Sequence, residues 1–546
     1  MDFREKDAIG MASGYNDVLL SVVCIVLLFL LSTACFFAVL KSLGFYKILV
    51  ASSALLGLAA ALLFLIKMRA KNIKTPAIVI SCAIIGASIF VANLVFDFSP
   101  DGIGYHQDAV LEMTKHFDLL RSSLGGKYPL YTNHYPKLAW YYTAALYALT
   151  DNIHIGKSIN FILFAAVFLM AYAVFRRIPL LPRILASLAL AGNPILISQL
   201  FSHYVDGVLG GFITISILGI YAFFWLERSK VVLIITILAI MGCAALKHTG
   251  FVFSFVIVSA IFYLLRKNSI KWSDYMQAPL FVSLMAMALI LLVNPYLTNL
   301  LSGKHIFYPS MGKGRVTTLI SGQTTKEFYE LDRFSKLMMS VFGKTANPDP
   351  KASPPFPEIK VPFTVDSREI AAMRGVDVRW GGWGPLFGGI LLISLLLLLM
   401  RGHLLSEYKV LIVVLIVLAL ISPESWWARL NPQLFVFSII LLMLFYRKDN
   451  RSRWLVNGLL LVALVNSGMI FRAALANVLD GDRYISGVIT DVAAKSAGEV
   501  CWNIKQAHLE PIFERLNIRW RSTSSCVTKK AYCKELLGET ICANGE

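Results

Sequence analysis

Long apolar runs recur along almost the whole chain, and they limit its fold more than any other feature. The first reads "VLLSVVCIVLLFLLSTACFFAVL" from Val18 to Leu40. A helix of about 20 apolar residues crosses a bilayer core of about 30 Å and satisfies its own backbone hydrogen bonds there. The sequence therefore predicts an all-α integral membrane protein. The composition agrees, because 15% of the residues are charged, against about 25% in soluble domains.

We predict about thirteen transmembrane helices from these runs. They lie near 17–40, 48–66, 77–96, 158–175, 181–202, 207–226, 231–247, 250–265, 277–296, 385–400, 408–424, 432–446 and 454–471. Segment 138–150, "LAWYYTAALYALT", is too short to cross, and we expect it to lie at the outer interface or to dip into it.

Basic residues set the orientation. Much of the positive charge, which is +18 net, lies in short clusters between apolar runs, such as "KMRAKNIK" from Lys67 and "YRKDNRSR" from Tyr446. Such clusters stay in the cytoplasm, which predicts a cytoplasmic N-terminus and an outer C-terminus. The start, "MDFREKDAIG", indicates no removable signal peptide. No basic stripe alternates with aromatic residues, so nucleic acid is not an expected partner.

The chain divides into three expected parts. These are an N-terminal helical hairpin (1–76), a transmembrane core (77–471) and a C-terminal tail (472–546), and the core carries outer loops at 97–157 and 298–384. Four of the eight cysteines fall in the tail, at Cys501, Cys526, Cys533 and Cys542. This distribution predicts two disulfides in an oxidising compartment, with the pairing left open.

Each outer loop has a readable local pattern. Apolar residues at helical spacing over 105–120 predict an amphipathic helix that lies flat on the membrane. In the second loop, "NPDPKASPPFPEIKVPF" from Asn347 excludes a long helix. It leads into "RWGGWGPLFGG" from Arg379, a glycine-rich aromatic hinge before the next span.

The unusual polar motifs all fall at the outer ends of spans or in outer loops. They are "DFSPDGIGYHQDAV" (97–110), "HYPKLAW" (134–140), "SHYVDG" (202–207), "LKHTG" (246–250), "NPYLTN" (294–299), "GKHIFYP" (303–309) and "PESWWARLNPQ" (423–433). Ionisable groups in a membrane protein mark function, so we expect these motifs to converge on one outward cavity.

Three kinds of side chain suit sugar transfer at this cavity. Asp101 can take a proton from an attacking hydroxyl. Cationic groups can hold phosphate, and aromatic rings can support a sugar or a polyprenyl chain. The cationic candidates are Lys247, His248, Lys304, His305 and Arg429, and the rings are Tyr308, Trp380, Trp383, Trp426 and Trp427.

The motifs resemble those of the GT-C membrane glycosyltransferases. "DGIGYH" followed by "HYPKLAW" is similar to their first outer loop, and "NPYLTN…GKHIFYP" and "GGWGPLFG" resemble bacterial members, over roughly 75–445. The resemblance implies a GT-C-like fold with inverting transfer on the outer face. It also implies a polyprenyl-phosphate-sugar donor and a bacterial inner membrane. The base would be Asp101, with Asp97 as the alternative.

The resemblance leaves several partners open. The acceptor would be a lipid-linked glycan, a polysaccharide or a protein. Because the chain shows no clear Asp-X-Asp metal motif, no metal ligand is assigned, and a divalent cation (Mg or Mn) remains the one cofactor to consider. His106 and Asp206 complete the expected substrate-binding set.

Each candidate also has a simpler structural role. Asp101 and Asp206 could cap a turn or a helix, and His106 could pack or accept a hydrogen bond. Lys247 and His248 could extend to the membrane surface, while Glu424 could pair with Arg429. The tryptophans could form an interfacial belt.

Other protein classes share many spans. A transporter would favour two matching halves, and the sequence has no internal repeat. A polysaccharide polymerase or ligase would depend on outer-loop arginines and histidines rather than on a first-loop acid. A non-catalytic scaffold for sugar lipids fits least well.

Overall fold

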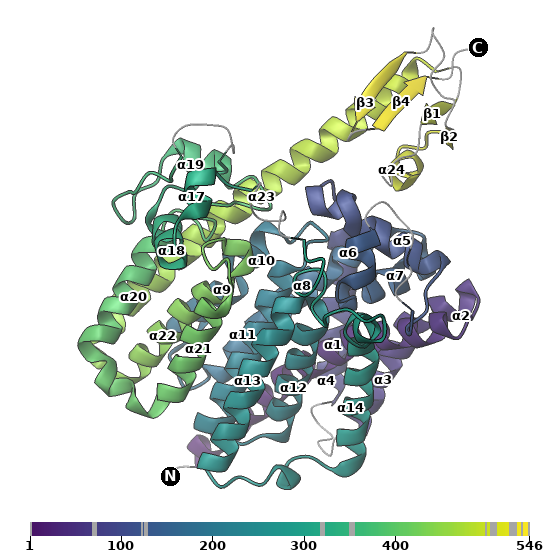
Figure 1. Cartoon of the computed structure of the whole chain (residues 1–546). Coiled ribbons are helices and arrows are strands. Elements are labelled where there is room, and N and C mark those ends of the chain that lie inside the picture. The colour runs from purple at the N-terminus through teal and green to yellow at the C-terminus, as the bar shows by residue number, and fades with distance from the viewer. Residues whose placement is uncertain are drawn as a thin grey trace.

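The computed structural model describes residues 3–67, 74–121, 124, 129–316, 323–348, 355–496, 499–502, 510–522, 532–536 and 539–543. Helices dominate, and most of them lie side by side in one body, from which the C-terminal part of the chain projects (Figure 1).

The N-terminal half consists of α-helices with short 3-10 and π segments. These are α1 Phe3–Ser42, α2 Lys47–Ala51, α3 Ser53–Lys67, α4 Lys74–Asn93, η2 Gly102–His106, α5 Gln107–Lys115, α6 Pro129–His134, α7 Leu138–Thr150, η3 Ile153–Lys157, α8 Ser158–Val174, α9 Leu180–Ala191, α10 Pro194–Ser198, α11 Asp206–Trp225, α12 Lys230–Leu246 and α13 His248–Lys267.

The C-terminal half continues in the same way and ends in a small sheet. It holds η4 Trp272–Asp274, α14 Ala278–Leu292, η5 Val293–Leu297, α15 Thr298–Leu301, α17 Lys326–Glu330, α18 Arg333–Phe342, α19 Ser367–Ala372, α20 Phe387–Arg401, η6 Gly402–Tyr408, α21 Lys409–Ile421, η7 Ala428–Leu430, α22 Gln433–Lys448, η8 Asn450–Ser452, α23 Arg453–Ala494, β1 Val500–Trp502, α24 Glu510–Arg515, β2 Trp520–Ser522, β3 Cys533–Leu536 and β4 Glu539–Ala543.

Among the described residues, nine helical segments are long and apolar enough to cross a membrane. They are Asn16–Ser42, Lys47–Phe64, Thr75–Asn93, Ile153–Val174, Asp206–Trp225, His248–Lys267, Ala278–Leu301, Phe387–Ile421 and Asn450–Ala494. Two shorter apolar helices, Leu180–Ala191 and Lys230–Leu246, lie beside them. The chain is therefore a mostly helical, multi-pass membrane protein, and the count of thirteen spans stays a prediction.

Three predicted spans differ from the helical segments of the structure. The run 181–202 is not one helix, because α9 ends at Ala191 and Pro194 begins the separate helix α10. Proline has no N–H for the preceding turn and clashes with it. The runs 385–400 and 408–424 form α20 and α21, which η6 joins into one apolar segment.

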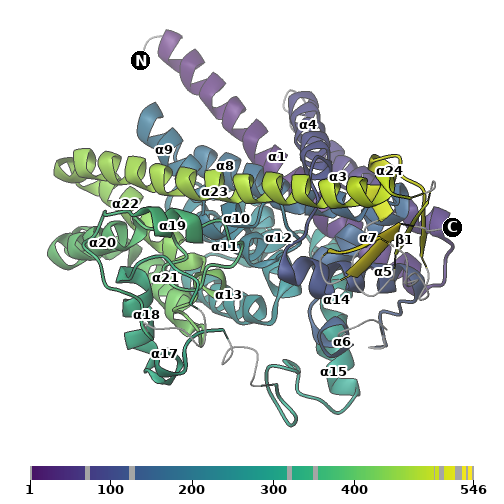
Figure 2. The ribbon, with the colours of Figure 1, turned by 90° about the horizontal axis from the view of Figure 1, so that it is seen from above.

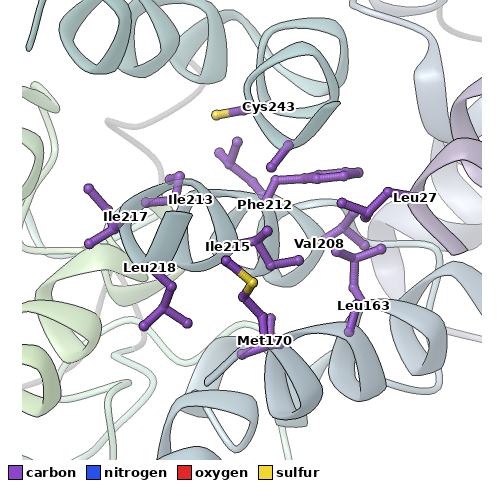
Figure 3. Close-up of a cluster of buried hydrophobic side chains, with 14 of the residues drawn as sticks. Leu27, Leu163, Met170, Val208, Phe212, Ile213, Ile215, Ile217, Leu218 and Cys243 are labelled. Atoms are coloured by element: carbon purple, nitrogen blue, oxygen red, sulfur yellow. The ribbon is translucent and has the colours of Figure 1, made fainter. Parts of the chain in front are cut away.

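The core lies around α11. Val208, Phe212 and Ile215 of α11 pack on side chains of α1, α8 and α12 (Figure 3). The helices α11 and α12 approach so closely that a Cβ at Gly219 would collide with Thr236. Helix α1 packs on α3, as the predicted hairpin requires, but also on α7 and α8, so it belongs to the core as well.

Segment 138–150 forms α7, which is largely buried. Trp140, Tyr141 and Tyr142 are all inside the protein, and α7 packs against α1 and α5. The short length prevents it from crossing a bilayer, as expected, but it is a core helix that supports the first outer loop rather than a helix on the surface.

The amphipathic helix of the first loop is confirmed, with a different end. Helix α5 stops at Lys115, and Ala109, Val110 and Met113 on its apolar face are fully buried. Leu120, which was expected on this face, is exposed. The buried face packs on α7.

The tail continues from the last span without a break. Helix α23 runs the full length of the helical body (Figure 2) and through the predicted boundary at 471. Beyond it, four short strands form a sheet in the order β2-β1-β4-β3. Cys533 and Cys542 form a disulfide between neighbouring strands. Cys501 is also disulfide-bonded, and Cys526 lies outside the described residues.

Candidate functional site

A cavity of about 590 Å³ lies where the first loop (97–157) and the second loop (298–384) meet the connectors of the helical body. The first loop contributes Asp101 and Tyr105, the second loop Asp377 and Arg379, and the connector before α22 contributes Arg429. Its other lining residues are Phe96, Asp97, Phe98, Ser99, Pro100, Gly104, Tyr131, Tyr135, Ser198, Phe201, Ser202, Tyr204, Gln323, Gly375, Val376, Trp427, Asn477 and Val478.

A second cavity of about 110 Å³ lies next to the first. Asp206, Lys247 and His248 line this smaller cavity together with His106 and Ser310. Four residues line both cavities and form the wall between them: Asp101, Tyr105, Tyr135 and Arg429. We call these four residues the dividing wall.

Arg429, which belongs to the dividing wall, contacts three carboxylates: Asp101 of the wall, Asp377 of the larger cavity and Asp206 of the smaller cavity. Its Nη2 lies 3.0 Å from Oδ2 of Asp101, and its Nη1 lies 2.8 Å from Oδ2 of Asp377. Its Nε is 3.3 Å from Oδ2 of Asp206, an ion-pair contact without hydrogen-bond alignment. The guanidinium therefore joins the first loop, the start of α11 and the second loop.

The carboxylates also neutralise the charge that Arg429 was expected to offer to a phosphate. Asp206 is further paired with Lys247, so the expected cations Arg429 and Lys247 are both engaged by acids. Asp101 is the N-cap residue of η2, and its side chain makes no capping hydrogen bond there. Asp206 is the first residue of α11, after the N-cap Val205, and supplies the acidic side chain of the first turn. Glu424 does not pair with Arg429 as considered, because it lies beside Lys336 and Trp426 instead.

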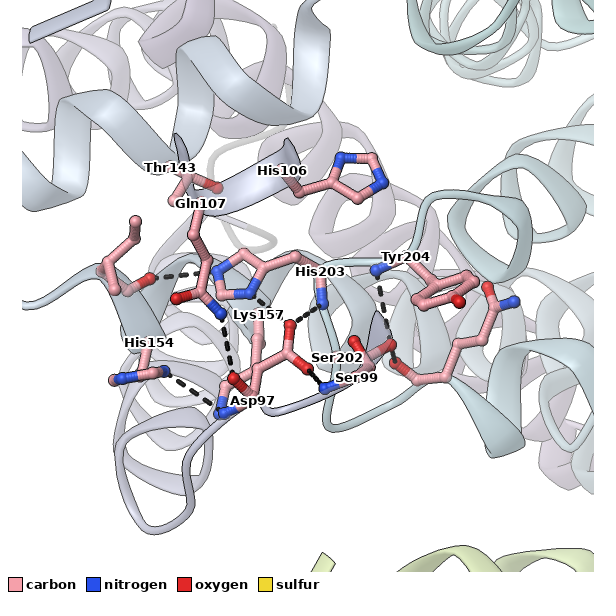
Figure 4. Close-up of polar contacts among 12 residues, drawn as sticks. Asp97, Ser99, His106, Gln107, Thr143, His154, Lys157, Ser202, His203 and Tyr204 are labelled. Carbon is pink, nitrogen blue, oxygen red and sulfur yellow. Dashed lines mark hydrogen bonds and ion pairs between the residues drawn. The ribbon is translucent and has the colours of Figure 1, made fainter. Parts of the chain in front are cut away.

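Asp97 and Asp101 have different surroundings, although four residues separate them. Oδ2 of Asp97 accepts hydrogen bonds from the backbone N–H and Nδ1 of His203, both at 2.7 Å, and Oδ1 accepts one from the backbone N–H of Ser99 at 2.9 Å (Figure 4). Asp97 is 4% exposed, whereas the Asp101 side chain is 27% exposed and lines both cavities.

The neighbours of Asp97 stabilise its ionised form. Burial alone would raise the pKa of Asp97, but the hydrogen bond and charge of His203, with Lys157 and Ser99, hold this pKa well below its usual range. With both oxygens accepting hydrogen bonds, Asp97 orders the loop. Asp101 is the better placed of the two to accept a proton from a substrate.

His106 packs inside the protein and accepts a hydrogen bond, which is the simpler of the two roles considered for it. It is buried, and its Nδ1 accepts a hydrogen bond from Nε1 of Trp140 at 2.7 Å. Burial lowers the pKa of His106 to about 4, so its ring is neutral at physiological pH. It lines the smaller cavity as an uncharged group.

The two predicted Lys-His pairs lie in different places. Lys247 and His248 line the smaller cavity, and Nε2 of His248 lies 3.1 Å from the backbone oxygen of His134. Lys304, His305 and Tyr308 line neither cavity. The Lys304 amine lies 3.0 Å from Nε2 of His134 and over the Tyr308 ring, so this segment supports the first loop.

The second loop contributes two charged residues that the sequence analysis did not single out. Asp377 binds Arg429 and accepts a hydrogen bond from Nε1 of Trp427 at 2.7 Å. Burial raises the pKa of Asp377 against the opposing charge of Arg429. Arg379 lines the larger cavity two residues later. Their signal was the charged pair inside "RGVDVRWGG", which precedes the hinge.

The predicted aromatic platforms are mostly structural. Trp380, Trp426 and Phe328 form a buried cluster, and Trp383 is buried in the main core. Only Trp427 among the predicted tryptophans lines the larger cavity, where its ring lies 5.0 Å from the Arg429 guanidinium. Three of the eight described aromatic residues that line this cavity are tyrosines of the first loop, Tyr105, Tyr131 and Tyr135.

The donor set does not fit a divalent metal. The three carboxylates, from Asp101, Asp206 and Asp377, surround the guanidinium of Arg429. This group already supplies the positive charge between them. Within the described ranges, no group of three or more His, Cys, Asp or Glu side chains could hold a metal ion. The chain does contain one Asp-X-Asp sequence at 480–482, but Asp480 pairs with Arg374 and Asp482 with Arg515, away from both cavities.

The fold and site together define a multi-pass helical membrane protein with a charged double cavity under two long loops. No protein-family model matches the chain, and no curated protein matches it.

Proposed function

We propose that the protein is a membrane glycosyltransferase of the GT-C type. It transfers a sugar from a polyprenyl-phosphate donor to an acceptor hydroxyl, with inversion at the anomeric carbon. The acceptor is a lipid-linked glycan, a polysaccharide or a protein. The site faces outward from a bacterial inner membrane, with thirteen spans, a cytoplasmic N-terminus and an outer C-terminus.

The position of Asp101 carries the proposal. Its carboxylate lies in the dividing wall, so it can contact ligands in both cavities. Arg429 binds Oδ2 and fixes the carboxylate, while Oδ1 accepts no hydrogen bond from the described residues. A base between two substrates needs this placement, because it must reach the acceptor hydroxyl while that oxygen attacks the donor.

The reaction balances around this carboxylate. The acceptor oxygen forms a bond to the anomeric carbon as its proton passes to Asp101. The bond from that carbon to the phosphate oxygen breaks, and the polyprenyl phosphate leaves with the electron pair. Arg429 holds Asp101 in place throughout, and no step needs a metal ion.

Tyrosine rings support the sugar-binding part of the proposal. The centroids of Tyr105 and Tyr131 lie 5.8 Å apart, and those of Tyr131 and Tyr135 lie 5.5 Å apart. All three line the larger cavity. Their faces offer apolar contact to a sugar ring, and burial raises the pKa of Tyr105, so its phenol remains a neutral hydrogen-bonding group.

The test uses Asp101→Asn, which keeps the shape of the side chain. A positioned base contributes about 10²–10⁴-fold, so transfer should fall at least about a hundredfold. Mass analysis of envelope glycans compares cells without the gene, with the wild type and with the variant. The wild type should restore one sugar that is missing from the deletion strain.

The matched control is Asp118→Asn, which removes a carboxylate of the same loop that lines neither cavity. It should restore the sugar fully, and all three proteins should reach the membrane in equal amounts. Full restoration by Asp101→Asn would contradict the proposal. It would favour a polysaccharide polymerase or ligase, an enzyme that is expected to depend on outer-loop arginines. Arg379 in the cavity is such an arginine.

A further inference from the structure

Among the described residues that line the larger cavity, Arg379 is an arginine with no carboxylate within ion-pair distance, although its charge acts on the nearby Asp377. Arg429 contacts three carboxylates and Lys247 contacts Asp206, so neither of these cations has its charge free for an anionic ligand. Arg379 lines the same cavity. No carboxylate of the described residues forms an ion pair with it.

The contacts of Arg379 leave donors available. Its Nη2 donates to Oε1 of Gln323 at 2.5 Å, and its guanidinium carbon lies 5.9 Å from the centre of the Trp427 ring. Its Nε is buried and has no hydrogen-bond partner among the described residues. An unsatisfied buried N–H on a charged group is costly, and the hydrogen-bonding capacity of the Arg379 guanidinium is therefore not used up by the described residues.

We infer that Arg379 binds the phosphate of the lipid donor, an assignment that rests on the proposed function. The planar guanidinium suits bidentate contact with phosphate oxygens. Asp377, two residues earlier, is tied to Arg429, which also holds Asp101. The phosphate-binding cation and the base are therefore linked through one set of ion pairs.

The charge of the site also selects the donor class. Among the described residues of the two cavities, and apart from Asp97, which is bound to His203, the acids Asp101, Asp206 and Asp377 equal the cations Arg429, Lys247 and Arg379 in number. Each further negative charge on a ligand is therefore costly, and a sugar linked through one phosphate, a diester, adds a single one. A diphosphate-linked donor carries a second charge, and the other described cations that line the two cavities are already paired with acids. As the sugar leaves, the diester becomes a monoester and gains charge at the oxygen that Arg379 contacts, which favours the transition state.

Equilibrium binding to the full-length protein in nanodiscs tests the assignment. The probes are farnesyl phosphate, farnesyl diphosphate and the neutral alcohol farnesol. Farnesyl phosphate is a monoester, like the polyprenyl phosphate that leaves in the proposed reaction, and it carries close to two negative charges at neutral pH. The wild type should bind farnesyl phosphate at least about ten times more tightly than farnesol, and the diphosphate no more tightly than the monophosphate. Arg379→Gln should lose this preference for the phosphate while its affinity for farnesol stays unchanged.

Two further variants make the outcome readable. Arg374→Gln removes an exposed arginine of the same loop, paired with Asp480 outside the cavities, and it should bind all three probes like the wild type. Arg379→Lys keeps the charge and should retain part of the phosphate preference. Equal loss for phosphate and alcohol in both Arg379 variants would overturn the assignment.

The remaining outcomes separate this inference from the proposed function. If Arg379→Gln prefers farnesyl phosphate as strongly as the wild type, the phosphate binds elsewhere, and only the role of Arg379 is overturned. If the wild type itself does not prefer farnesyl phosphate to farnesol, the lipid-phosphate donor is wrong, and the proposed function is overturned with it.

Discussion

At the scale of single residues, Asp97 and Asp101 show how burial separates two neighbouring carboxylates into different roles. The sequence placed both in one motif and offered them as alternatives for one task. In the structure, both carboxylate oxygens of Asp97 accept hydrogen bonds, whereas Asp101 lies between two cavities. Sequence spacing carries no information about which carboxylate is buried, so this distinction needed the three-dimensional contacts.

We predict that Asp97→Asn destabilises the protein more than Asp101→Asn. Both oxygens of the buried Asp97 accept hydrogen bonds, from His203 and from Ser99, and a hydrogen bond to a charged group contributes about 1.5–3 kcal/mol. Asp101 is partly exposed, and Arg429 keeps two other carboxylates without it. Thermal unfolding in detergent measures both variants, and a larger loss for Asp101→Asn would contradict the two roles.

A second residue-scale prediction concerns pH and His106. Its pKa is about 4 in the folded protein and about 6.5 in an unfolded chain. Between these values the unfolded state binds the proton and the folded state does not. Stability should therefore fall as pH decreases from 6.5 to 4, by about 3 kcal/mol from this residue.

The variant His106→Gln isolates that contribution. Glutamine keeps an acceptor for Nε1 of Trp140 but does not titrate. Its unfolding midpoint should depend less steeply on pH over this range than that of the wild type. Parallel curves for the two proteins would show that His106 is already protonated in the folded state or exposed to water.

At the scale of elements, the site is formed by two loops and by connectors between the helices. Asp377 connects the second loop to the connector before α22 through Arg429 and Trp427. Nearby, Ala346 and Trp380 exchange two backbone hydrogen bonds of 3.0 Å within that loop. The ion pair thus joins an ordered loop to the dividing wall.

We predict that Asp377→Ala loosens this loop. Hydrogen bonds to charged groups contribute about 1.5–3 kcal/mol each, so the amides of Ala346 and Trp380 should exchange with deuterium at least about ten times faster. Asp480→Ala, which removes the exposed partner of Arg374, serves as the control and should leave both amides unchanged. Equal protection in Asp377→Ala would mean that the loop is held by its own contacts.

Local patterns predicted elements well where one physical signal dominated. Apolar spacing identified α5, and length identified the long spans. The run 181–202 failed because hydropathy outweighed Asn193 and Pro194, which begin a new helix. The charged pair Asp377 and Arg379 is visible in the sequence, but it was missed as part of the site because the residues that it meets come from segments far away in the sequence. A local pattern does not specify such distant partners.

At the scale of the whole molecule, the two cavities, the long loops and the tail can be related to one membrane side. Ser310 lines the smaller cavity, so the segment that follows it marks the side on which the site opens. Lys313 in that segment is exposed, and so is Arg228, which lies in a basic cluster between α11 and α12. With the predicted spans, the positive-inside rule puts the basic cluster of Arg228 in the cytoplasm, so we expect Lys313 and Arg228 on opposite sides of the membrane.

Cysteine labelling in intact cells tests this arrangement directly. A membrane-impermeant maleimide should label Lys313→Cys from outside, after removal of any outer envelope barrier, and should label Arg228→Cys only once the membrane is opened. The chain without an added cysteine gives the background. Because a polyprenyl-phosphate donor on the outer leaflet can be used only from that side, labelling of Arg228→Cys alone in intact cells would invert the orientation. The site would then face the cytoplasm, where the reducing environment does not favour the tail disulfide between Cys533 and Cys542.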